Sequence, residues 1–155
     1  MGHDIVTLIP ARRGSTRIRD KNIQVVGQRN LICRAVDFSL ECGLKDIYVY
    51  TDYEASEIGI GEEFVLKRDS LDSSVFSAAD EYIYNFITRL HLSNQIIVLL
   101  QPTSPFRETN LLKSTLKSLD HIDSLGLYAT MTLSYDSMWE YKNEHMCSVR
   151  PNEKR

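Results

Sequence analysis

The segment best suited to chemistry is a polar loop that follows the first apolar run of the chain. Its five basic side chains are Arg12, Arg13, Arg17, Arg19 and Lys21. The whole chain, by contrast, has 21 acidic and 18 basic residues and a formal net charge of −3. Gly14 and the two hydroxyl residues after it can bring backbone N–H groups close to phosphate oxygens. The loop therefore favours a polyanion, with a nucleoside triphosphate as the natural candidate.

A solvated charged loop is the alternative interpretation, and it would be preferred if the loop stood alone. Its place directly after a strand favours ligand binding instead. The loop contains no G-x-G-x-x-G and no G-x-x-x-x-G-K-[ST]. These absences argue against a dinucleotide-binding dehydrogenase and against a P-loop NTPase.

The apolar pattern predicts the elements that must position this loop. Apolar runs of strand length occur at 5–9, 47–50, 64–66, 95–100 and 127–133. Apolar residues at three- and four-residue steps predict helices over 31–40, over 77–90 and from 109 onward. Strands that alternate with amphipathic helices indicate an α/β fold, with a doubly wound, mostly parallel sheet. In such sheets ligands bind outside the carboxyl ends of the strands.

Two longer motifs resemble a known family. Residues 9–15 read IPARRGS and continue to Lys21-Asn22, which is similar to the first-loop signature of the acylneuraminate cytidylyltransferases. Residues 101–107 read QPTSPFR and resemble a second segment of that family. Shorter matches are Thr51-Asp52 and Arg68. The resemblance runs from about residue 5 to residue 107 and implies a Rossmann-like nucleotidyltransferase domain.

The resemblance implies a cytidylyltransferase that activates a nine-carbon 2-keto sugar acid (sialic, legionaminic or pseudaminic acid) with CTP, giving the CMP-sugar and pyrophosphate. The anomeric hydroxyl would attack the α-phosphate in line, without a covalent enzyme intermediate. Two alternatives stay open. One is a 3-deoxy-manno-octulosonate cytidylyltransferase, although we expect that family to lack the Lys21-Asn22 pair and the 101–105 segment. The other is a nucleotide-binding remnant without turnover.

The resemblance also assigns roles to individual residues. Arg12, Ser15 and Lys21 would hold the triphosphate, and Lys21 and Arg12 are the catalytic candidates. Gln101 would face the sugar, since a side-chain amide both donates and accepts hydrogen bonds. The full set expected at the nucleotide is Ala11, Arg12, Gly14, Ser15, Lys21, Asn22, Arg68 and Ser77. For Ser77, three residues before Asp80, a helix cap is the preferred interpretation.

Mg²⁺ is the cofactor that the resemblance implies, but the carboxylates that hold it in the family have no counterpart in this sequence. We therefore expect residues 1–155 to be a single cytidylyltransferase-like domain that lacks the family's C-terminal portion, with a homodimer implied by the resemblance. The acidic balance argues against a nucleic-acid partner, and the short apolar runs against a membrane partner. Three cysteines without a CxxC pair favour a reducing cytoplasm.

Overall fold

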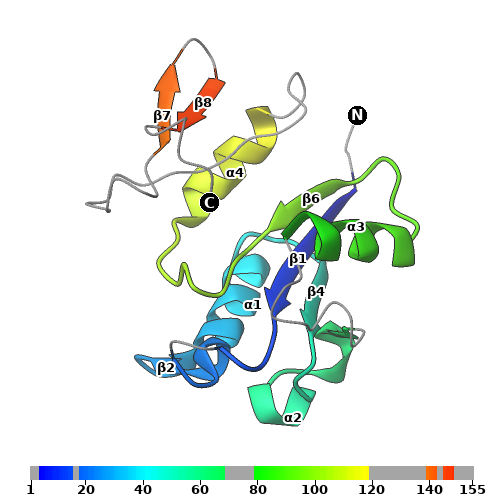
Figure 1. Ribbon diagram of the computed structural model, residues 1–155, viewed down its shortest axis with the longest axis vertical. Helices are drawn as coiled ribbons and strands as arrows, with labels where there is room; N and C mark the ends of the chain where they lie inside the picture. Colours follow the sequence, from blue (N-terminus) through cyan, green and yellow to red (C-terminus); the bar gives the residue numbers. More distant parts are fainter. Residues whose placement is uncertain (1–3, 16–17, 69–78, 119–138, 143–144, 149–155) are drawn as a thin grey trace. The chain divides into compact units, whose positions relative to one another are not determined.

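The computed structural model describes residues 4–15, 18–68, 79–118, 139–142 and 145–148. The chain divides into two compact units, residues 1–118 and 119–155. The first unit holds every described helix and the main sheet (Figure 1). In the second unit, β7 (Trp139–Lys142) and β8 (His145–Ser148) form an antiparallel hairpin. This division does not decide the single-domain prediction, which stays a prediction.

The sheet of the first unit has four parallel strands in the order β5-β4-β1-β6. The strands are β1 (Ile5–Ala11), β4 (Asp46–Thr51), β5 (Val65–Lys67) and β6 (Ile96–Leu99). Leu8 lies opposite Tyr48 on one side and Leu99 on the other, so β1 is a central strand. The parallel sheet confirms the α/β prediction.

Helices pack on both faces of this sheet, because the side chains of β1 alternate between the faces. Ile9 and Ala11 face a core that contains α1 (Leu31–Glu41) and Leu112 of α4 (Thr109–Ser118). Val6 and Leu8 face the opposite core, which is closed by Phe86 of α3 (Ala79–Arg89). The shorter helical segments are α2 (Ala55–Ile58), η1 (Lys21–Ile23) and η2 (Glu62–Phe64).

The first strand is longer than the sequence predicts, because it continues through Pro10 to Ala11. The carbonyl of Leu8 accepts the N–H of Leu100 at 2.9 Å, so Leu8 turns its backbone groups toward β6. The backbone of Pro10, two residues later, also faces the β6 side of the strand, but Pro10 lies beyond the last β1–β6 pair. The missing N–H of proline therefore costs no ladder hydrogen bond there.

Two further differences concern short elements. A small hairpin of β2 (Val25–Val26) and β3 (Arg29–Asn30) was not predicted from the sequence. Its strands are only two residues long, too short for a period-two pattern to show. The strand expected at 127–133 and the capping serine at 77 lie outside the described residues. No helix in the described part of the chain is long and apolar enough to cross a membrane.

Candidate functional site

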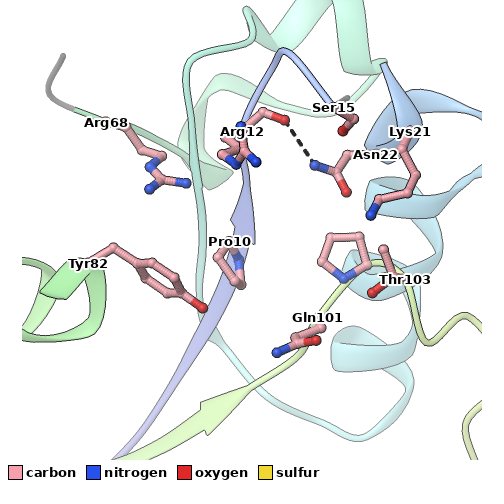
Figure 2. Close-up of a pocket in the computed structure, with 10 residues that line it drawn as sticks. Pro10, Arg12, Ser15, Lys21, Asn22, Arg68, Tyr82, Gln101 and Thr103 are labelled. Atoms are coloured by element: carbon pink, nitrogen blue, oxygen red, sulfur yellow. Dashed lines mark hydrogen bonds between the residues drawn. The ribbon is translucent and has the colours of Figure 1, made fainter. Parts of the chain in front are cut away.

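A pocket opens at the carboxyl edge of the sheet, where the segments after β1, β5 and β6 meet (Figure 2). This is the position expected for a ligand in an open parallel sheet. Figure 2 shows Tyr82 and Gln101 on one side of the pocket, and Arg12, Ser15 and Lys21 on the other. The described residues that line it are Pro10, Arg12, Ser15, Lys21, Asn22, Arg68, Tyr82, Gln101, Pro102 and Thr103.

Positive charge dominates the lining. It contains three cationic side chains, those of Arg12, Lys21 and Arg68, and no carboxylate among the described residues. Ser15, Asn22, Gln101 and Thr103 add hydroxyl and amide groups. A concave surface with one sign of charge concentrates ligands of the opposite sign. The pocket is therefore suited to an anion with several hydrogen-bonding groups.

Asn22 shapes the loop that carries the first two cations. Its side chain is buried, and Nδ2 donates a 3.0 Å hydrogen bond to the carbonyl oxygen of Arg12 (Figure 2). This bond joins the beginning of the loop to its end across ten residues. Arg12 and Lys21 are thereby brought to the same pocket, although Arg12 directly follows β1 and Lys21 begins η1.

The ends of β1 and β4 are also joined, so the loop starts from a rigid base. The hydroxyl of Thr51 is buried and donates to the carbonyl oxygen of Ala11 at 2.5 Å. Asp52, the next residue, accepts the backbone N–H of Arg13 on Oδ1 at 2.8 Å. Asp52, part of a short motif match in the sequence, thus holds the first residues of the loop to the end of β4.

Arg13 turns away from the pocket. Its guanidinium forms an ion pair with Glu57 of α2, and its Nε donates to the Asp52 carbonyl oxygen at 3.3 Å. The hydrogen bond that Arg13 donates to the Glu57 carboxylate raises the pKa of Arg13. The pKa of Glu57 is lowered, first by the backbone N–H of Glu54 and then by Arg13. The two adjacent arginines thus have different surroundings, because Arg12 lines the pocket and Arg13 is paired with α2.

Arg68 lies between two aromatic rings. Its guanidinium carbon is 5.3 Å from the ring centre of Tyr50 and 5.2 Å from that of Tyr82. Its backbone N–H donates to the Thr51 carbonyl oxygen at 2.9 Å, which continues the β4–β5 pairing. Burial raises the pKa of Tyr82, and the nearby Arg68 partly opposes this rise. The two rings hold the guanidinium in place at one end of the pocket.

Gln101 is exposed on the turn that follows β6 and also lines the pocket. Its backbone carbonyl oxygen accepts a hydrogen bond from the N–H of Ser104 at 3.1 Å and another from Nη2 of Arg107. The backbone of the turn is therefore fixed, while the side-chain amide of Gln101 lines the pocket. Thr103, which was not among the predicted site residues, lines the pocket as well.

The structure gathers six of the predicted site residues around one pocket: Arg12, Ser15, Lys21, Asn22, Arg68 and Gln101. Ala11 is fully buried in β1, and Gly14 is exposed in the loop with a φ of 70°; neither is among the lining residues. Ser77 lies outside the described residues. The roles assigned to all of these residues remain predictions.

Sequence reasoning missed Pro10, Tyr82 and Pro102 as lining residues. Tyr82 carried a usable signal, since it lies one helical turn before the fully buried Phe86. That spacing places it on the sheet side of α3. Pro10 and Pro102 belong to the two quoted motifs, but no site role was expected for either.

A magnesium site is not evident in the described part of the chain. No group of three or more His, Cys, Asp or Glu side chains there is placed to hold a metal ion. The lining of the pocket supplies oxygen only from hydroxyl and amide groups and from the backbone. Because Mg²⁺ prefers carboxylates, the described residues do not fit a metal held by the protein alone.

A parallel sheet with helices on both faces and a cationic pocket at its carboxyl edge defines a Rossmann-like α/β fold. The chain belongs to the cytidylyltransferase family, whose sequence pattern matches residues 6–146. Both findings confirm the fold and family predicted from residues 9–15 and 101–107.

Individual relatives support this placement. An N-acylneuraminate cytidylyltransferase of Streptococcus agalactiae serotype III (strain NEM316) is 34% identical over 110 residues, covering 67% of this chain and 26% of the relative. A 3-deoxy-manno-octulosonate cytidylyltransferase of Marinomonas sp. (strain MWYL1) is 24% identical over 156 residues, which cover 98% of this chain and 57% of the relative. The chain thus spans between a quarter and somewhat over half of these relatives' lengths.

A solved structure shares the fold. It is described as a CMP:2-keto-3-deoxy-manno-octonic acid synthetase complexed with CTP, and it superimposes with a TM-score of 0.62 at 18% sequence identity. The superposition covers 78% of this chain and 49% of that one. At this identity the match establishes the fold.

Proposed function

We propose that this chain binds CTP and catalyses, or forms the nucleotide-binding part of an enzyme that catalyses, transfer of CMP to a nine-carbon 2-keto sugar acid. The observation that carries the proposal is the convergence of six residues from separate segments on one cationic pocket. The family match at residues 6–146 supports cytidine nucleotide chemistry.

In the proposed reaction the anomeric hydroxyl of the sugar acid attacks the α-phosphorus of CTP. A sugar–phosphate bond forms, the bond to the β-phosphate oxygen breaks, and the leaving oxygen takes its electrons into pyrophosphate. The hydroxyl proton passes to solvent. Arg12 and Lys21 would stabilise the negative charge that develops on the phosphates, and Arg68 would hold the nucleotide. Positioning and charge stabilisation therefore account for the protein's part, without a covalent intermediate.

The sugar acid is proposed to lie against Gln101, whose amide is exposed above a fixed turn. The Streptococcus relative favours a nine-carbon acid. An octulosonate is the second candidate, because the Marinomonas relative matches nearly the whole chain. Lys21-Asn22 and the 101–107 segment favour the nine-carbon acid. A nucleotide-binding remnant is the third possibility to be tested.

Magnesium, a homodimer and a cytoplasmic location complete the proposal. The first two rest on the family resemblance. The location is supported by Cys33 and Cys42, which are buried free thiols. Burial raises the pKa of both thiols, so they remain protonated and unreactive under ordinary conditions.

Gln101→Ala is expected to raise the KM for the sugar acid by about tenfold, because a ligand hydrogen bond is lost, and to leave the KM for CTP nearly unchanged. The assay measures pyrophosphate release from CTP and Mg²⁺ with sialic, legionaminic, pseudaminic and octulosonic acids. Gln28→Ala is the matched control, since Gln28 is exposed in the turn between β2 and β3.

Each outcome of this assay decides between the candidates. The fastest turnover with a nine-carbon acid supports the proposal, whereas preference for the octulosonic acid supports the second candidate. Retained CTP binding without release for any acid indicates the remnant. Equal, mild changes in both KM values for Gln101→Ala would contradict the role given to that residue.

A further inference from the structure

Asp20 has an unusual backbone conformation next to the principal catalytic candidate. Its φ of 48° and ψ of 42° lie in the left-handed region, which is unfavourable for residues other than glycine. Its carbonyl oxygen accepts the N–H of Ile23 at 3.0 Å and so begins the 3₁₀ turn. The conformation of Asp20 therefore sets the direction in which Lys21 leaves the loop.

The side chain of Asp20 is held by a residue distant in sequence. The hydroxyl of Tyr53 donates a 3.0 Å hydrogen bond to Oδ1 of Asp20, across 33 positions of the chain. Burial, and next the hydrogen bond to Asp20, raises the pKa of Tyr53, so its phenol stays protonated and keeps donating. The left-handed turn is thus fixed by a tertiary contact.

Tyr53 is itself held firmly. Its side chain is fully buried, and its backbone N–H donates to Oγ1 of Thr51 at 3.1 Å. Its carbonyl oxygen accepts Nζ of Lys67 at 3.0 Å. The guanidinium of Arg13 lies 4.3 Å above its ring centre. Tyr53 thus belongs to the rigid carboxyl end of β4, from which it reaches the far end of the phosphate-facing loop.

We propose that Tyr53 and Asp20 form a positioning pair that orients Lys21 toward the pocket. Asn22 fixes the loop to the carbonyl of Arg12, and the Tyr53–Asp20 bond fixes the residue on the other side of Lys21 to the end of β4. Lys21 lies between these two fixed points. A charged group displaced by about 1 Å can lose much of its effect on a bound phosphate. The inference rests on the proposed function, because it concerns the same pocket.

Three substitutions separate this role from a purely structural one. Tyr53→Phe removes only the donated proton. Asp20→Gly removes the acceptor but relieves the left-handed strain, because glycine adopts that conformation freely. Asp20→Asn keeps an acceptor oxygen and tolerates the same backbone. A structural role alone predicts that Asp20→Gly is stable and binds CTP like the wild type.

The positioning role predicts instead that Tyr53→Phe and Asp20→Gly each weaken CTP binding by about tenfold, because a displaced Lys21 loses the equivalent of one hydrogen bond to a charged phosphate. Asp20→Asn should lose less than Asp20→Gly. Affinity is measured by calorimetric titration of the 155-residue chain. Tyr84→Phe is the control, because Tyr84 is 68% exposed on α3. Wild-type affinity in Tyr53→Phe and Asp20→Gly would overturn the proposal.

A second readout keeps this inference separate from the proposed function. Residual dipolar couplings of the backbone at Asp20 and Lys21 are expected to change in Tyr53→Phe, with no change at Gly43. If the wild type fails to bind CTP, the proposed function fails, and the couplings alone decide the positioning pair. Unchanged couplings at Asp20 and Lys21 would then overturn it.

Discussion

Lys21→Ala is expected to lower the rate of pyrophosphate release by about a hundredfold or more, with a smaller effect on the affinity for CTP. Lys21 lines a pocket whose described residues include no carboxylate, so its charge is available to a ligand. Without the Lys21 ammonium, the negative charge that develops on the leaving pyrophosphate loses a stabilising cation. Steady-state assays at saturating sugar acid measure the effect on kcat.

Two further variants sharpen this result. Lys21→Arg keeps the charge but replaces a compact ammonium with a planar fork, so partial activity is expected. Lys45→Ala removes an exposed lysine just before β4 and should behave like the wild type. A Lys21→Ala protein with wild-type kcat would show that the charge has no part in transfer.

Phe86→Ala is expected to lower the free energy of unfolding by about 3–5 kcal/mol, because it leaves a cavity in a closed core. Phe86 is fully buried and packs on β4, with its ring centre 5.8 Å from that of Tyr48 and 6.0 Å from that of Tyr50. It is buried in the core on that face of the sheet, and Tyr82, Ile83 and Ile87 of α3 pack beside it. The same helix carries Tyr82 to the pocket.

Urea unfolding followed by circular dichroism measures this loss of stability. Tyr84→Ala, on the exposed side of the same helix, should change the unfolding free energy by less than about 0.5 kcal/mol. Phe86→Leu should lie between the two alanine variants, since it fills part of the cavity. A loss below about 1 kcal/mol for Phe86→Ala would mean that α3 is not held by this core.

The longer helices and strands of the first unit could be predicted because their signals are local. The apolar run at 5–9 and the three- and four-residue steps over 31–40 depend only on neighbouring side chains, and both elements form as expected. The ends of strands were harder to predict, because β1 can continue through Pro10 only where β6 has already ended. No local pattern contains that information.

The composition of the pocket was predictable in part. Arg12, Lys21 and Gln101 belong to long motifs, so their convergence followed from the motif order and from the geometry of parallel sheets. The Tyr53–Asp20 and Asp52–Arg13 bonds join residues 33 and 39 positions apart. Such contacts exist only once the strands have paired, and a single sequence does not show them.

The different directions of the Arg12 and Arg13 side chains also could not be predicted from the sequence. Both are basic residues of one loop, and their types do not distinguish them. The ion pair with Glu57 of α2 takes Arg13 out of the pocket. Without the position of α2, the sequence could count positive charges in the loop but could not assign their directions.

CTP binding at this pocket is tested most directly by titrating the ¹⁵N-labelled chain with CTP and following the amide chemical shifts. We expect saturable shifts that cluster at Arg12, Ser15, Lys21 and Asn22, with Gly43 at the far end of α1 unaffected. The same titration of Lys21→Ala should need a higher CTP concentration to reach saturation. Shifts that fail to saturate, or that gather away from the pocket, would contradict a CTP site at the carboxyl edge of this sheet.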